Sequence, residues 1–251
     1  MQKPIFDIRR RGLIKSRAAR SHTTHFLLDR AFDDMIDRVT LADHHTIALV
    51  GRFRPEWLGF LEKQGARVLL IDPSAIESGD AERLAVDSAI GDALAICSLV
   101  ISFGLLDHCN DPKLAAFLLG QLLAPEGTLV GSIVGGESLT FLRGILLEMD
   151  RSGGQAAARL HPMMDGQSVA ALLGDAGFQN TVVDVDRLHV RYRDLPHLVS
   201  DLRDMGCSRS LSAPATPIKP SAWRHTTSTM GVKSAEERFD LINFAARKAH
   251  G

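Results

Sequence analysis

The chain has 251 residues, 45% of them hydrophobic and 24% charged, and its formal net charge is -1 at pH 7. This balance predicts a soluble globular protein and excludes a general electrostatic attraction to nucleic acid or to a membrane surface. The three cysteines have no paired spacing, which argues against disulfides or a thiolate metal site and favours a reducing compartment, and no apolar run approaches the roughly 20 residues that span a bilayer.

The N-terminal part of the chain is basic. Residues 1–30 carry eight Lys or Arg against two Asp. Such a pattern is typical both of a mitochondrial transit peptide and of a basic surface helix. Apolar residues then recur at helical spacing, which predicts a helix over residues 22–39. We expect residues 1–44 to form a helical segment ahead of a main domain that spans residues 45–251.

Strands and helices alternate along the main domain. Short apolar runs predict buried strands at 46–51, 66–74, 97–104 and 128–136. Helical patterns predict helices at 54–65, 111–127, 137–150, 165–178 and 194–206. Two later segments, 180–192 and 237–246, predict strands that add an antiparallel edge. The alternation predicts an α/β protein with a mainly parallel sheet covered by helices.

One long segment near the C-terminus has an unusual composition. Residues 205–235 contain no Asp or Glu and are rich in Ser, Thr and Pro. This composition predicts a mobile loop or lid. If the protein works by binding another protein, we expect this segment, with Trp223 and Arg224, to contact the partner.

Several stretches resemble a known family. The segments PEGTLVGSIVGGESLTFLR, HPMMDGQSVAALLGDAGF and VVDVDRLHVRYRDLPHLVSDLRDMG resemble class I S-adenosylmethionine-dependent methyltransferases. Within this class, the segments resemble one branch in particular. That branch contains bacterial relatives of the biotin-pathway malonyl-carrier-protein methyltransferase and a mitochondrial complex I assembly factor of methyltransferase type. Both ends of the chain also resemble this branch. The N-terminal arginines then belong to the domain, which favours the cytoplasm over the alternative, the mitochondrial matrix.

The resemblance implies a doubly wound, Rossmann-like sheet of seven strands in the order 3-2-1-4-5-7-6, with strand 7 antiparallel. S-adenosylmethionine would lie across the carboxyl ends of strands 1, 2 and 4, where the strand order reverses. Four residues stand at positions that bind the cofactor in this family: Gly51, Asp72, Asp87 and Phe103. Asp72 would accept hydrogen bonds from the ribose hydroxyls, although an Asp before a proline is also an ordinary turn residue. Asp87 would lie near the adenine amino group.

The segment SFGLLDHCND after the expected fourth strand holds the candidate catalytic residues. Asp107 and His108 stand where the branch usually has His and Trp, on the side expected to face the substrate. Either side chain would accept a proton from a methyl acceptor, while a surface histidine at a strand end is the alternative. The acceptor, a small molecule or a protein, is not indicated by the sequence. No metal site is expected, because the histidine pairs lack a second pair at metal-ligand spacing.

The stretch ALVGRFRPE, residues 48–56, departs from the family pattern. The family's first loop has the form D-x-G-x-G-x-G, whose glycines let the backbone approach the methionine half of the cofactor. Here only Gly51 remains, and Arg52 and Arg54 bring positive charge toward a sulfonium cation. Two like charges about 5 Å apart repel by roughly 3 kcal/mol at an effective dielectric constant near 20.

Three hypotheses follow from this degenerate loop. The first is an S-adenosylmethionine-dependent methyltransferase with an unusual loop. The second is a non-catalytic binding or assembly protein that keeps the methyltransferase fold and has lost cofactor binding. The third is an anion site at the helix that starts near Pro55, where free N–H groups and the helix dipole favour negative charge.

Overall fold

The computed structural model describes residues 4–18, 25–71, 95–154, 157–206, 210–213, 215–229 and 234–249. The helices are α1 (Ile8–Ala18), α2 (Phe26–Asp37), α3 (Pro55–Lys63), α5 (Pro112–Leu122), α6 (Thr140–Ser152), α7 (Gly166–Asp175), α8 (Leu195–Asp204) and α9 (Pro220–Thr229). The strands are β1 (Thr46–Gly51), β2 (Arg67–Ile71), β3 (Cys97–Phe103), β4 (Leu123–Gly135), β5 (Phe178–Tyr192) and β6 (Ala235–Lys248). Within the described ranges, no helix has the length and apolar character needed to cross a bilayer.

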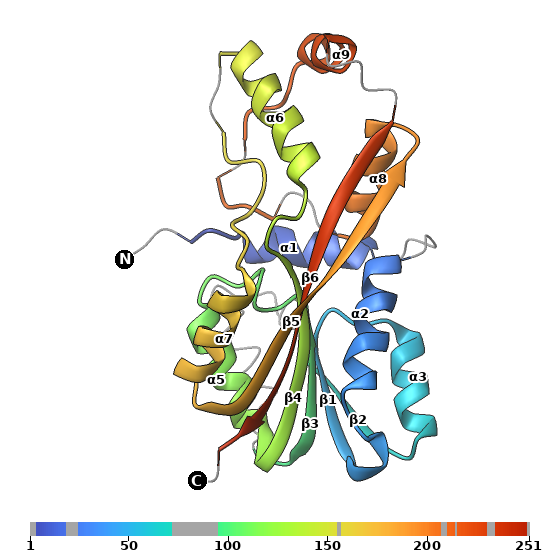
Figure 1. Ribbon diagram of the computed structural model, residues 1–251, viewed down its shortest axis with the longest axis vertical. Helices are drawn as coiled ribbons and strands as arrows, with labels where there is room; N and C mark the ends of the chain where they lie inside the picture. Colours follow the sequence, from blue (N-terminus) through green and yellow to red (C-terminus); the bar gives the residue numbers. More distant parts are fainter. Residues whose placement is uncertain are drawn as a thin grey trace. The chain divides into compact units, whose positions relative to one another are not determined.

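The α/β class and its sheet are confirmed. The sheet has the order β2-β1-β3-β4-β6-β5, and β1 pairs in parallel with β2 and β3, as β3 does with β4. Figure 1 shows β5 and β6 running in opposite directions, as expected of the antiparallel edge. The described residues hold six strands where we expected seven. These six follow the expected order with strand 3 left out, and residues 72–94 lie outside the described part of the chain.

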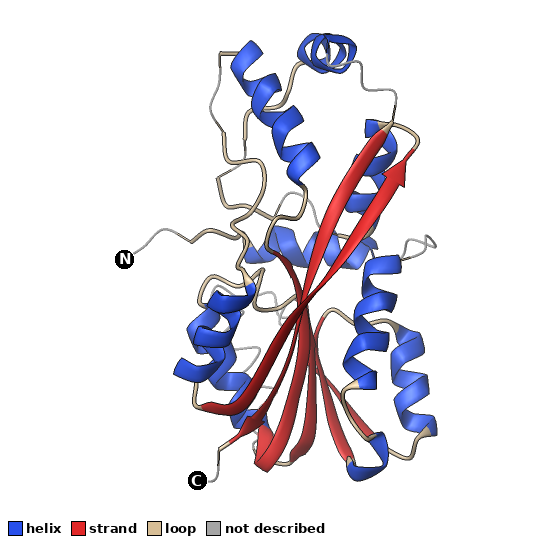
Figure 2. Ribbon diagram, in the orientation of Figure 1, coloured by secondary structure: helices blue, strands red, loops and turns tan. Residues whose placement is uncertain are grey.

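Contacts divide the chain into two compact units. Unit 1 comprises Met1–Thr23, Glu137–Met163 and Arg187–Asp240, and unit 2 comprises Thr24–Gly136, Met164–Asp186 and Leu241–Gly251. In unit 2 the helices form two layers, with α2 and α3 on one side of the sheet and α5 and α7 on the other (Figure 2). Because both faces are covered, β1 is an almost continuous apolar run rather than an alternating one, and its residues after Thr46 are all buried.

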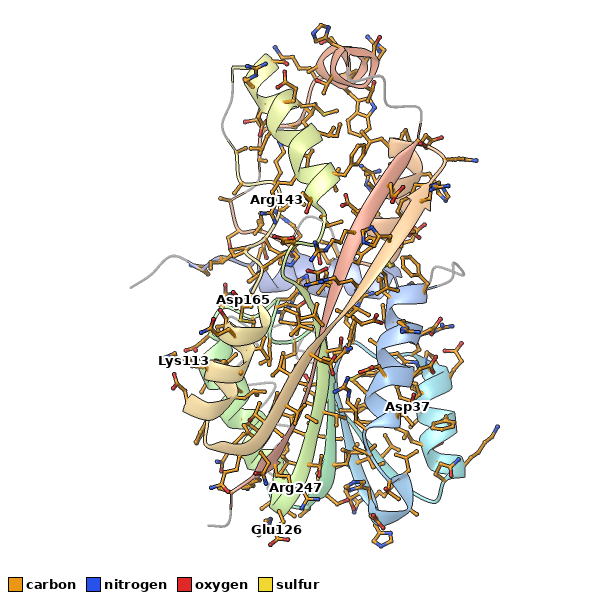
Figure 3. The ribbon with its side chains drawn as sticks, in the orientation of Figure 1. Asp37, Lys113, Glu126, Arg143, Asp165 and Arg247 are labelled. Carbon is orange, nitrogen blue, oxygen red and sulfur yellow. The ribbon has the colours of Figure 1, made fainter. Side chains whose placement is uncertain are left out.

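Two details of the predicted elements were wrong. The helix expected over 111–127 ends at Leu122, and β4 begins at Leu123 rather than beyond Gly127. A register shift in the β3–β4 pairing, together with a positive φ at Glu126, accommodates the Pro-Glu-Gly segment within the strand. Figure 3 labels Glu126 at the end of the sheet where β4 begins.

The segment expected to be a loop over residues 205–235 contains a helix. α9 begins at Pro220, a residue whose fixed φ suits the first turn of a helix, and contains the Trp223 and Arg224 that we assigned to a loop. α9 packs against α6 within unit 1, and its Thr226 is 1% exposed. Burial of one side of the helix against α6 therefore outweighs the weak helix propensity of its Ser and Thr residues.

The N-terminus of α6 is capped by a residue far along the chain. The carboxylate of Glu237 on β6 accepts hydrogen bonds from the backbone N–H groups of Phe141 (3.2 Å) and Leu142 (2.8 Å). These are two of the N–H groups that a helix leaves without an intrahelical partner, and Leu139 at the N-cap position makes no side-chain cap. Glu237 is 1% exposed, and burial raises the pKa of its carboxyl above the usual value although these N–H groups oppose the shift.

We predict that Glu237→Ala lowers the free energy of unfolding by about 1–3 kcal/mol, because two buried N–H groups lose their acceptor. Glu237→Gln keeps one acceptor oxygen and is expected to cost less. Urea unfolding followed by circular dichroism measures both. Equal stability of the alanine variant and the wild type would contradict the capping role.

The raised pKa of Glu237 also predicts a pH dependence. A carboxyl with a higher pKa in the folded state than in the unfolded state contributes stability that is full below the unfolded pKa, near 4.3, and is lost as the pH rises through the folded value. The stability of the wild type relative to Glu237→Gln should therefore fall as the pH rises above about 4. Unfolding measured at a series of pH values tests this, and a difference independent of pH would contradict it.

Candidate functional site

The expected cofactor site lies in unit 2, at the carboxyl ends of β1 and β3. Gly51 ends β1 in register with Phe103 at the end of β3. Its φ of +92° is a conformation that side chains disfavour, and a Cβ there would lie 2.5 Å from the carbonyl oxygen of Phe103. The next N–H, that of Arg52, donates to the same oxygen at 2.7 Å. Gly51 is thus required for close contact between two strands of the chain itself.

The side chain of Arg52 covers the end of β3. Gly104 follows β3 with a φ of +63°, and a Cβ on it would lie 3.2 Å from Cδ of Arg52 and 3.5 Å from Cγ. The methylene groups of Arg52 therefore occupy the space directly above this glycine. In the family that the sequence resembles, glycines at this end of the sheet leave room for a ligand. Here the Cγ and Cδ atoms of Arg52 lie within 3.5 Å of the position that a Cβ of Gly104 would take.

The second arginine of the loop is neutralised locally. Arg54 lies at the N-cap position of α3, before Pro55, and its Nη1 donates to Oδ2 of Asp29 on α2 at 2.7 Å. Its Nη2 donates to Oε1 of Glu56 at 3.2 Å. The electrostatic conflict expected between Arg54 and a sulfonium cation is therefore reduced, and Arg52 is the arginine of the loop that lies over the strand ends.

The chain also approaches itself closely at the end of β4. A Cβ on Gly135 would lie 2.2 Å from the carbonyl oxygen of Met164. That oxygen accepts a hydrogen bond from the N–H of Gly136 at 2.8 Å. α7 begins after its N-cap residue, Asp165. The segment just before this helix therefore contacts the end of β4. Figure 3 labels Asp165 at this position.

Asp107 and His108 lie together in the loop after β3. Nδ1 of His108 is 3.1 Å from Oδ2 of Asp107, and the backbone N–H of Val134 donates to the same oxygen at 3.4 Å. The N–H of His108 donates to the carbonyl oxygen of Leu105, which closes a tight turn. Asp107 is 5% exposed and His108 8%. The structure therefore brings the two candidate catalytic residues together, in a buried place.

The other candidate residues divide into two groups. Phe103 is 3% exposed, and its carbonyl oxygen is used by the N–H of Arg52, so its cofactor role stays a prediction. Asp72 and Asp87 lie outside the described residues. Sequence reasoning missed the pairing of Arg54 with Asp29, since no local spacing connects two residues 25 positions apart.

Comparison with known proteins gives partial matches in sequence. No protein-family model matches the chain. Over 110 residues it is 36% identical to "Arginine-hydroxylase NDUFAF5, mitochondrial" of Danio rerio, a stretch that is 43% of this chain and 34% of that protein. Over 90 residues it is 29% identical to malonyl-[acyl-carrier protein] O-methyltransferase 1 of Coxiella burnetii, or 36% of this chain and 29% of that protein. The chain thus spans about a third of the length of these relatives.

Comparison with solved structures gives a likeness over nearly the whole chain. One match is to the complex between the Trm112 methyltransferase activator of Haloferax volcanii and its methyltransferase partner, with a TM-score of 0.53 and 14% identity. It covers 98% of this chain and 99% of that chain. At this level of identity, the likeness establishes the fold.

We predict that Gly51→Ala lowers the free energy of unfolding by about 2–4 kcal/mol, because the methyl group forces both a strained backbone and a clash with Phe103. Gly59→Ala, within α3, is the matched control. A Cβ on Gly59 meets nothing within 4 Å, so this change should stabilise the protein by up to about 1 kcal/mol. Thermal and urea unfolding measure both, and similar effects of the two changes would contradict the close contact.

Proposed function

We propose that this member of the class I methyltransferase superfamily is a binding or assembly protein that does not hold S-adenosylmethionine in the way its fold implies. The superfamily assignment rests on the sequence relatives and the shared fold, and it confirms the resemblance inferred from the sequence. The observation that supports the binding role is the side chain of Arg52 over Gly104. The same fold hosts many functions, so the function is inferred from the residues at the site.

On this proposal the described residues hinder binding of the methionine half of the cofactor. The space above Gly104 is occupied by Arg52, a residue with a fixed positive charge. The backbone at the start of the loop is held close to β3. Gly51 packs against the carbonyl oxygen of Phe103, and the N–H of Arg52 donates to the same oxygen.

The names of the relatives support a role that need not be methyl transfer. One relative is named an arginine hydroxylase and another an O-methyltransferase, so the related sequences carry different activities. The structural match is to a complex with a methyltransferase activator, so that protein works with a partner chain. We propose that this chain also works through a protein partner.

We propose a reducing compartment for the protein. Cys97 and Cys109 are buried free cysteines, and burial raises the pKa of the Cys97 thiol to about 11. The NDUFAF5 relative is named as mitochondrial. The cytoplasm and the mitochondrial matrix both meet the condition, and we retain the cytoplasm as the proposal for this chain.

A second candidate function is methyl transfer, and the Asp107–His108 pair favours it. The carboxylate of Asp107 lies 3.1 Å from Nδ1 of His108, and either side chain would accept a proton from a bound acceptor. On this hypothesis Asp107→Asn and His108→Gln would stop turnover of S-adenosylmethionine and leave its binding unchanged. On the binding hypothesis the wild type itself does not turn over S-adenosylmethionine, so neither variant changes the turnover.

The deciding experiment is calorimetric titration of the folded protein with S-adenosylmethionine and S-adenosylhomocysteine. We predict no saturable heat up to about 1 mM ligand, which corresponds to a binding free energy weaker than roughly 4 kcal/mol. Arg52→Ala removes both the bulk and the charge and should bind more tightly than the wild type. Arg151→Ala is the matched control, because Arg151 is an exposed arginine on α6, paired with Glu148.

Micromolar binding by the wild type would overturn the proposal and leave the methyltransferase as the better account. The titration is meaningful only for folded protein, so the circular dichroism spectrum and the unfolding midpoint of each variant accompany it. Binding by Arg151→Ala to the same extent as by Arg52→Ala would contradict the specific role of Arg52.

A further inference from the structure

We propose that unit 2 carries a second binding site, a small pocket that takes an aromatic carboxylate. The pocket lies between α5, the end of α7 and the end of β6, and its volume is about 170 Å³. It is at the edge of the sheet where β3 and β4 begin, with Cys97 paired to Leu123. The candidate cofactor site is at the carboxyl ends of β1 and β3, so this inference does not depend on the proposed function.

Two glycines shape the pocket. α5 and α7 lie side by side on this face of the sheet (Figure 1). Gly120 on α5 leaves room for the ring of Phe178, since a Cβ on this glycine would lie 3.5 Å from Cζ of that ring. Gly177 follows α7 with a φ of +88°, and a Cβ there would meet nothing within 4 Å. The turn between α7 and β5 therefore places no side chain over the pocket.

Two aromatic side chains give the pocket its apolar character. Phe178 is 6% exposed and belongs to the core, whereas Phe117 on α5 is 49% exposed. An apolar group in the pocket would remove part of the Phe117 ring from water, and an aromatic group would add favourable contacts between ring edges and faces. A cavity of about 150 Å³ in another protein binds benzene, so the volume here suits one phenyl ring.

A lysine supplies positive charge to the same pocket. Nζ of Lys248, at the end of β6, donates to the carbonyl oxygen of Leu123 at 2.6 Å. This bond uses one of the three N–H groups of the ammonium. Within the described ranges, no carboxylate lies at ion-pair distance from Lys248. Because the side chain is partly buried, its charge is screened less than that of an exposed lysine, and it favours an anionic group on the ligand.

A carboxylate matches the polar groups of the pocket better than a phosphate does. The described residues that line it include no Asp or Glu, and Gln121 adds an amide that can donate to a second oxygen. Phosphates are typically held by arginine or by helix N-termini. Here α7 presents its C-terminal end, which disfavours a multiply charged anion. One ammonium and one amide beside two phenyl rings therefore select a monoanion with an aromatic group.

The test titrates the full chain with 3-phenylpropionate and with the neutral 3-phenylpropionamide, followed by heteronuclear NMR. We expect saturable shifts of the amide signals of Gly120 and Gly177, with a Kd of about 1 mM or tighter for the acid. The neutral amide should bind at least tenfold more weakly. Lys248→Met should weaken binding of the acid at least tenfold, and Phe117→Ala at least threefold.

Matched controls come from α3 in the same unit. Lys63→Met removes an exposed lysine, and Phe60→Ala removes a phenyl ring that is 39% exposed. Each should change the affinity less than twofold. Lys248→Arg keeps the charge and should bind within about threefold of the wild type. Circular dichroism establishes that each variant is folded.

Three outcomes would overturn the inference: no saturable shift, equal affinity for the acid and its neutral amide, or equal effects of Lys248→Met and Lys63→Met. The same carboxylate chemistry occurs in a free acid and at the C-terminus of a peptide. Binding of N-acetyl-Ala-Ala-Phe at least tenfold tighter than that of 3-phenylpropionate would support the site and identify a chain terminus as its source. Binding of the free acid with equal or higher affinity would support the site as one for a small molecule.

Discussion

A single close contact between two parallel strands shapes the end of the sheet where a ligand is expected. Gly51 lies against the carbonyl oxygen of Phe103 without room for a Cβ, and that oxygen also accepts the N–H of Arg52. The backbone of Arg52 is fixed by this contact, and its side chain then extends over Gly104. Glycine thus serves the packing of the chain against itself, whereas the same residue type elsewhere leaves space for a ligand.

The loop that follows β1 contains a second arginine, Arg54. Arg54 is bound by Asp29 and Glu56, so its charge is compensated at the surface of α2 and α3. The methylene groups of Arg52 lie beside Gly104 at the end of β3. The fold is like that of the solved methyltransferase structure, whereas the sequence of the first loop departs from the D-x-G-x-G-x-G pattern, so the fold does not fix the function.

Much of the fold follows from patterns in the sequence, because buried strands and amphipathic helices leave local signals. The β4 boundary at Leu123 left no such signal, since Pro125 and Gly127 resemble a helix stop and only the pairing with β3 shows that they belong to a strand. α9 escaped prediction because its Ser and Thr residues favour loops until packing on α6 compensates. The positions of Gly51 at the end of its strand and of Asp107 and His108 after theirs were predictable, whereas the contact between Arg52 and Gly104 depends on long-range geometry.

The cap on α6 has a consequence for the order in which the protein is made. Glu237 is synthesised 95 residues after Leu142, the N–H of which it binds. At a ribosomal rate of about 5–20 residues per second, α6 therefore waits roughly 5–20 s for the carboxylate that completes its first turn. During that interval its N–H groups depend on water. Unit 1, whose segments are drawn from three separate parts of the chain, can complete its folding only once most of the polypeptide has been synthesised.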